Sequence, residues 1–228
     1  MSRPADAAHP AELVTLAREC ERYLAARAGQ GIATVRREIG TASRGTPARR
    51  PGQPNPVVTR YLDRALAALL GDDPPLAGAI AAAAPLLRWL TYDAYGADIG
   101  PDFPKSHAYA SLVGGADAPF SARPDFNFGL FIIAPGTLYR DHRHAAPELY
   151  APLTGPHFWR FTPGVRFRAR AAHVPVWNRA NRPHATLSGD VPFLALYAWT
   201  RDLTSRAAVL PADDWARYEG AGRRDRSR

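Results

Sequence analysis

Cysteine is nearly absent from this chain of 228 residues, which contains a single one, Cys20. One cysteine cannot close a disulfide within the chain, and it excludes a zinc site built from several thiolates. The sequence therefore suits a reducing compartment. Because 46% of the residues are hydrophobic, a chain of this length can bury a sizeable core without covalent staples.

Long apolar runs are also lacking. The longest, residues 76–87, contains Pro85 and is shorter than the about 20 residues that a membrane-spanning helix needs. The first ten residues, MSRPADAAHP, lack the apolar core of a signal peptide. We therefore expect a cytoplasmic protein that does not insert into a membrane.

Positive charge exceeds negative charge, with 29 Lys and Arg against 21 Asp and Glu and a net charge of +8. Part of the excess lies in residues 36–50 and in the last seven residues, GRRDRSR. Neither stretch contains interleaved aromatic residues, and no nucleic-acid-binding motif accompanies them. We interpret them as solvated surface and expect no nucleic-acid partner.

The first hundred residues predict helices. Apolar residues recur at helical spacing over 11–29, and two further Ala- and Leu-rich segments, 57–71 and 75–91, predict two more helices. Residues 41–56 are rich in Pro, Gly and Arg and indicate a loop. Pro85 should kink or break the last helix.

From Ser106 onward, short runs of β-branched and aromatic residues alternate with turn residues, which predicts a sandwich or barrel. The sequence thus predicts a mostly β fold: a helical region over 1–100 that packs on a barrel over 101–210. Residues 211–228 should follow as a tail with a short helix near 212–219 and disorder over 220–228. The expected strands are 106–113, 126–133, 138–144, 148–153, 157–161, 165–170, 173–177, 184–188 and 192–199.

One segment carries the residues of a metal site. Residues two apart on a strand share a face, so His142 projects with His144, and Glu148 projects with Tyr150. Residues 145–147 can form a bend between two strands. If the strands pair across that bend, two imidazoles and a carboxylate converge inside the barrel and form an open metal site.

A fourth ligand must come from elsewhere, and His184 is the best candidate because it lies in a turn that leads into an apolar strand. The remaining histidines have no carboxylate or partner pattern at ligand spacing. Three imidazoles and one carboxylate suit one divalent transition metal ion: Fe, Zn, Mn, Co or Ni. The remaining histidines are His9, His107, His157 and His173.

The segment from Gly136 to Gly155 resembles the first cupin motif, Gly-x5-His-x-His-x3-Glu-x6-Gly, and matches it at every fixed position. The second cupin motif, Gly-x5-Pro-x-Gly-x2-His-x3-Asn, is degraded. His184 occupies its histidine, and Asn181 replaces its second glycine. Because asparagine tolerates the left-handed conformation, the turn can survive. The other departures are His173, Arg179 and Ser188.

A narrower resemblance is to the cupin-type dimethylsulfoniopropionate (DMSP) lyases. Tyr139 stands three residues before His142 and Tyr150 stands two residues after Glu148, as in that family's signature. The phrase His-Arg-His-Ala-Ala-x-Glu-Leu-Tyr and the ending Leu-Ala-Leu-Tyr-Ala-Trp are also similar to that family. The resemblance is strongest over 105–203. Before residue 100 it is limited to the layout, a helical region that precedes the barrel.

This resemblance implies a carbon–sulfur lyase that eliminates dimethyl sulfide from DMSP and leaves acrylate. Tyr150 is the expected general base, because it shares a face with Glu148 and a nearby cation would favour its phenolate. Tyr139 has the opposite parity to His142, so it needs a bulge to enter the same cavity. We expect it to hold the substrate or share in proton transfer.

The substrate implied is a small sulfonium carboxylate. Trp199 and Tyr197 are the residues expected to contact it, because aromatic faces attract cations. A homodimer is compatible with the resemblance, since cupins often pair.

Two other functions fit the same ligands, because a fold hosts many chemistries. One is another metal-dependent cupin enzyme, a dioxygenase or isomerase acting on a small carboxylate. The other is a non-catalytic cupin that binds a small molecule. Tyr139 and Tyr150 favour the lyase over an oxygen-activating site, which has no need for two tyrosines.

Overall fold

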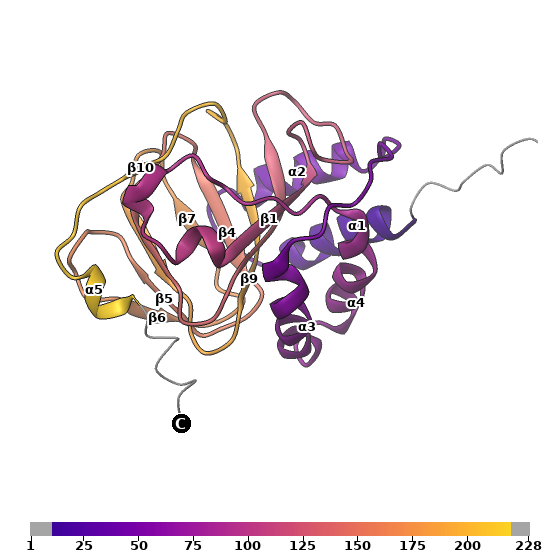
Figure 1. The fold of residues 1–228 in the computed structure, drawn as a ribbon. Coiled ribbons are helices and arrows are strands. Elements are labelled where there is room, and N and C mark those ends of the chain that lie inside the picture. The colour runs from indigo at the N-terminus through magenta and orange to yellow at the C-terminus, as the bar shows by residue number, and fades with distance from the viewer. Residues whose placement is uncertain (1–10, 220–228) are drawn as a thin grey trace, which may run out of the picture.

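A computed structural model describes residues 11–219. Four helices come first and ten strands follow, with one short helix after the last strand (Figure 1). The helices are α1 (Ala11–Ala25), α2 (Ile32–Ala42), α3 (Pro56–Leu70), α4 (Pro74–Ala83) and α5 (Trp215–Tyr218), with 3₁₀ turns at Ala84–Leu86, Gly96–Ile99 and Phe103–Lys105. The strands are β1 (His107–Val113), β2 (Asn127–Ile133), β3 (Leu138–Arg143), β4 (Glu148–Pro152), β5 (His157–Arg160), β6 (Arg168–Arg170), β7 (Val176–Asn178), β8 (His184–Leu187), β9 (Phe193–Trp199) and β10 (Ala208–Val209).

The strands form two five-stranded antiparallel sheets. The first has the order β1-β2-β9-β4-β7 and the second has the order β10-β3-β8-β5-β6. Figure 1 shows the helices α1 to α4 gathered on one side of the strands. The mostly β architecture with a helical region before it is the one predicted from the sequence.

The first sheet is buried on both faces, and strand β2 shows why. Leu130 and Ile132 belong to the same apolar cluster as the helices, whereas Phe131 and Ile133 belong to a second cluster inside the barrel. Residues that alternate along a strand point to opposite faces, so both parities must be apolar here. The helices therefore cover the outer face of this sheet and leave its inner face for the cavity.

Helices α3 and α4 begin at capping residues. The side chain of Asn55 accepts a hydrogen bond from Val57 N at 2.9 Å, and that of Asp73 accepts one from Leu76 N at 3.2 Å. Both caps precede a proline in the first turn, where a missing N–H costs nothing. Helix α4 ends at Ala83 and continues as a 3₁₀ turn that contains Pro85, so the expected break at this proline is confirmed.

Three elements differ from the sequence-based expectation. Helix α2 was not predicted, and α1 ends at Ala25, short of the expected 29. Gly31 separates the two helices with φ 84, and a Cβ there would lie 2.1 Å from the ring of Trp177 on β7. Only glycine allows this close approach of the helical region to the barrel. The two-residue strand β10 was not predicted either.

A buried ion-pair cluster ties the C-terminal segment to strand β3. The fully buried Arg160 side chain donates to both oxygens of Asp141 and to the carboxylate of Asp214. The indole N–H of Trp215, at the start of α5, donates to Asp141 at 2.8 Å. The short helix expected near 212–219 is thus present as α5, and the predicted disorder over 220–228 lies outside the described residues. None of the helices in the described chain is long and apolar enough to cross a bilayer.

Replacing Arg160 with alanine should destabilise the fold by about 3–5 kcal/mol, because the buried Asp141 carboxylate would lose its charge partner. Chemical denaturation of the wild type and the variant measures the difference. Arg166→Ala, on an exposed side chain of the next loop, is the matched control and should change stability by less than about 0.5 kcal/mol. A loss below about 1 kcal/mol for Arg160→Ala would contradict this account of the cluster.

Candidate active site

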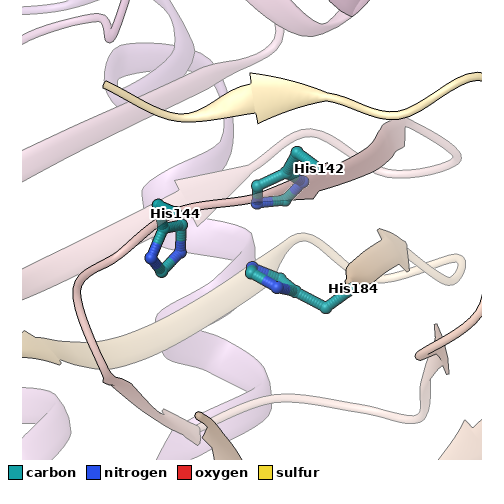
Figure 2. Close-up of side chains that lie close together, drawn as sticks. All are labelled: His142, His144 and His184. Carbon is teal, nitrogen blue, oxygen red and sulfur yellow. The ribbon is translucent and has the colours of Figure 1, made fainter. Parts of the chain in front are cut away.

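Three histidines meet inside the barrel. His142 lies on β3, His144 follows that strand, and His184 begins the neighbouring strand β8. The register pairs His142 directly with His184. One ring nitrogen from each of the three lies within 4.8 Å of the others, and all three side chains are buried. Figure 2 shows the rings turned toward a common point.

Backbone carbonyls fix how these imidazoles face. The Nδ1 atom of His142 is 2.7 Å from Arg140 O, that of His144 is 2.7 Å from Ala146 O, and that of His184 is 3.0 Å from Arg182 O. A carbonyl oxygen can only accept, so each Nδ1 carries the hydrogen. In the neutral ring the lone pair is then on Nε2, and all three Nε2 atoms are buried without a hydrogen-bond partner in the described chain.

Glu148 joins the histidines from strand β4. Its Oε2 lies 3.3 Å from His144 Nε2 and 3.5 Å from His184 Nε2. Its carboxylate also accepts hydrogen bonds from two donors, Asn178 Nδ2 at 3.0 Å and the indole nitrogen of Trp199 at 2.7 Å. These bonds hold the carboxylate in one orientation, as partners of metal ligands commonly do.

This arrangement fits a bound cation. Three nitrogen lone pairs and a carboxylate oxygen face one another at short range, which is unfavourable unless positive charge lies between them. Imidazole nitrogen and carboxylate oxygen are ligands for Zn, Fe, Mn, Co and Ni ions. The structure thus brings together His142, His144, Glu148 and His184, the four residues predicted as ligands.

Burial and mutual charge set the protonation of the cluster. Burial holds the pKa of His142 well below its usual value, and the neighbouring His184 and His144 lower it further. Burial alone would raise the pKa of Glu148, but the adjacent imidazoles of His144 and His184 hold it well below its usual range. Neutral His142 and ionised Glu148 are the forms that a metal ion binds.

A cavity of about 190 Å³ opens beside Glu148. It is smaller than the about 300–1,000 Å³ of pockets that hold drug-sized ligands, so it suits a small molecule. Glu148 is its one acidic residue, and the lining residues, all within 11–219, include no lysine or arginine. The lining residues are Tyr92, Tyr95, Tyr109, Asn127, Phe131, Tyr139, Glu148, Tyr150, Tyr197, Trp199 and Leu203.

Tyr150 lines this cavity on the same face of β4 as Glu148, as the parity argument predicts. Burial raises the pKa of the Tyr150 phenol well above its usual value, and the negative charge of Glu148 raises it further. A phenolate at this position therefore requires a compensating positive charge nearby.

Tyr139 faces the cavity because strand β3 is irregular at this point, as its odd spacing from His142 requires. The pairing of β3 with β8 shifts register between Tyr139 and His142, so both side chains turn inward. The Tyr139 ring stacks between Phe103, at 3.8 Å between centroids, and His142, at 4.0 Å. Its hydroxyl is hydrogen-bonded to the hydroxyl of Tyr95.

Tyr197 and Trp199 line the cavity from strand β9, where contact with substrate is predicted. The hydroxyl of Tyr197 lies 3.2 Å from Ser111 Oγ. Trp199 has two roles in the site. Its ring tilts over His144 at 4.6 Å between centroids, and its N–H donates to Glu148. The same side chain therefore lines the cavity and orients a candidate metal ligand.

Sequence reasoning missed Tyr95, which enters the site from the loop between the helices and the barrel. His107 fastens this loop at both ends, because its Nδ1 is 2.7 Å from Phe103 O and its Nε2 accepts from Tyr92 N at 3.0 Å. Arg140 holds the middle through Asp98 O at 2.7 Å. The only local signal was a pair of tyrosines in a short polar segment.

The other described histidines lie outside the three-histidine cluster. His107 stacks on Phe103, and His157 lies 3.1 Å from the hydroxyl of Thr154. His173 bridges Tyr23 on α1, at 2.9 Å, and Asp72, at 3.1 Å. Asn181 has φ 58, which confirms that asparagine carries the left-handed turn before His184.

Fold and site together define a cupin with a buried three-histidine and glutamate centre beside an aromatic cavity. Residues 31–195 match the model of the dimethylsulfoniopropionate (DMSP) lyase family. The DMSP lyase DddQ of Ruegeria pomeroyi is 33% identical over 153 residues, which are 63% of this chain and 73% of that protein. The chain belongs to the DMSP lyase family.

Solved structures agree with the fold. A crystal structure of DddQ from Ruegeria pomeroyi covers 89% of this chain and 98% of its own, with a TM-score of 0.63 and 24% identity. A structure from work on the DMSP lyases RdDddP and RnDddQII covers 90% and 100%, with a TM-score of 0.64 and 22% identity. The predicted fold class and family are confirmed, and so is the predicted class of enzyme, a carbon–sulfur lyase.

His184→Gln should lower the affinity for a divalent transition metal at least about tenfold, because one of the convergent nitrogens is lost. Metal content is measured by mass spectrometry after loading and desalting. His173→Gln removes a histidine outside the site and should retain the wild-type metal content. Equal metal content in both variants would show that His184 is not a ligand.

Proposed function

We propose that this protein cleaves DMSP by β-elimination into dimethyl sulfide and acrylate. One observation carries the proposal: a small cavity is lined by the buried phenol of Tyr150 and by Glu148, whose carboxylate lies within 3.5 Å of the unpartnered Nε2 atoms of His144 and His184. DMSP cleavage is the activity named for the family and for the DddQ relative. The cavity supplies the three things this reaction needs, which are a cation site, a base and an apolar enclosure.

We expect the carboxylate of the substrate to bind beside the histidines. The lining residues offer it no lysine or arginine, so the histidine and glutamate centre is where a carboxylate would find positive charge. A divalent ion held by His142, His144, Glu148 and His184 would draw charge from that carboxylate and favour the phenolate of Tyr150. We expect the ion to be one of Fe, Zn, Mn, Co or Ni.

Tyr150 is the proposed base. Its phenolate takes the proton from the carbon next to the carboxylate, and the C–H electron pair becomes the new C=C bond of acrylate. The C–S bond breaks, and its electron pair leaves on sulfur as neutral dimethyl sulfide. The proton on Tyr150 then returns to solvent, so atoms and charge balance.

Tyr139 is proposed to hold the substrate or share the proton, since its hydroxyl lies at the cavity in a bond with Tyr95. Trp199 and Tyr197 present aromatic faces to the sulfonium end, where cations are attracted. The helical region over 1–100 is proposed to support the barrel over 101–210 from outside. A cytoplasmic location and a homodimer stay predictions.

Gas-phase detection of dimethyl sulfide from metal-loaded protein and DMSP tests the function. Tyr150→Phe should lower turnover at least about 100-fold without loss of metal, because a general base of this kind contributes that much. Glu148→Ala should lose both metal and activity. Full turnover by Tyr150→Phe would refute the base assignment, and absence of dimethyl sulfide from the wild type would refute the function.

Tyr95→Phe keeps the ring and removes the bond to Tyr139. We expect kcat to fall about tenfold with metal content unchanged, which corresponds to one hydrogen bond. Tyr218→Phe makes the same change outside the cavity and should retain wild-type kcat. The Tyr95 effect should disappear in a Tyr139→Phe background, and a fully additive double variant would contradict action through Tyr139.

A further inference from the structure

A row of paired residues crosses the cavity floor. The register sets Asn127 on β2 opposite Trp199 on β9, and Trp199 opposite Glu148 on β4. Residues directly opposite one another share a face, so all three side chains point into the barrel. Neighbouring strands are about 4.8 Å apart, which puts Asn127 roughly 10 Å along the sheet from Glu148. The two polar groups therefore mark opposite ends of the row.

The amide oxygen of Asn127 is buried and has no hydrogen-bond partner in the described chain. Most buried polar atoms are paired, so each exception calls for an explanation. The unpaired nitrogens of His142, His144 and His184 are explained by a metal ion. Asn127 lines the same cavity, so a bound molecule is the natural partner for its oxygen.

The donor end of the same amide is directed elsewhere. Burial raises the pKa of Tyr197, and hydrogen bonds from Ser111 and Asn127 act against that rise. The amide N–H group of Asn127 thus acts on the Tyr197 phenol, and the carbonyl oxygen is the end of the amide that has no partner in the described chain.

The surroundings of that oxygen select the chemistry of its partner. Tyr109 and Tyr197 meet edge to face at 6.2 Å between centroids, and both line the cavity with Trp199. Aromatic faces and an unpaired carbonyl oxygen both attract positive charge. A sulfonium or quaternary ammonium group fits, because its polarised methyl C–H groups can approach the oxygen.

We propose that Asn127 is a specificity-determining residue, whose amide oxygen contacts the cationic end of a zwitterionic substrate while the acid end lies beside Glu148. The identity of that substrate as DMSP rests on the proposed function. The distance between the two ends makes the cavity selective for a carboxylate and a cation at a fixed separation. A thioether acid of the same length, whose sulfur carries no positive charge, gains nothing from Asn127.

Calorimetric binding to the metal-loaded protein tests this without any turnover. The ligands are 3-(trimethylammonio)propionate, which carries the positive charge, and 3-(methylthio)propionate, which lacks it. Asn127→Leu keeps the approximate size and should weaken the cationic ligand about tenfold. The binding of 3-(methylthio)propionate, whose sulfur is uncharged, should change less than about twofold. Asn127→Asp adds negative charge at the same place and should increase the preference for the cationic ligand.

Equal weakening of both ligands by Asn127→Leu would indicate general damage to the cavity and overturn the proposal, as would an unchanged ratio in both variants. Failure of 3-(trimethylammonio)propionate to bind the wild type would overturn it too. The lyase function fails separately, if the wild type releases no dimethyl sulfide from DMSP. An active lyase whose KM for DMSP is the same in Asn127→Leu would sink the specificity proposal alone.

Discussion

Three short hydrogen bonds from imidazole Nδ1 atoms to backbone carbonyls determine the chemistry of this barrel. They turn the Nε2 lone pairs of His142, His144 and His184 toward one point, where Glu148 adds its carboxylate. Each carbonyl lies within two residues of its histidine, so the orientation is set by the local backbone. The rest of the fold must keep this backbone rigid and dry.

The two-sided burial of the first sheet holds strand β4, which carries Glu148. Helices α1 to α4 cover the outer face of this sheet (Figure 1). The cavity occupies its inner face. On the opposite side of the site, the Arg160 cluster fixes Asp141, the residue next to His142. The site is therefore held from two directions by contacts that never touch a substrate.

Site residues could be predicted from the sequence where they lie close together along the chain. His142, His144, Glu148 and Tyr150 lie within nine residues of one another, so strand parity alone placed them together. Tyr139 needed a bulge that parity demanded without locating it. Tyr95 was missed because tertiary contacts of its loop with His107 and Arg140 bring it to the site. Strand β10 was missed because it has only two residues. Helix α2 was missed although its buried residues Ile32, Val35 and Ile39 recur at helical spacing.

Because Trp199 has two roles, the shape of the cavity and the orientation of the Glu148 carboxylate cannot be changed independently at this residue. Its ring borders the space for the ligand, and its N–H steadies the Glu148 carboxylate. An exchange of this tryptophan for a smaller residue, made to admit bulkier molecules, would also loosen the Glu148 carboxylate. Evolution of this lineage toward new substrates is therefore expected to begin at other walls of the chamber and to leave the indole in place.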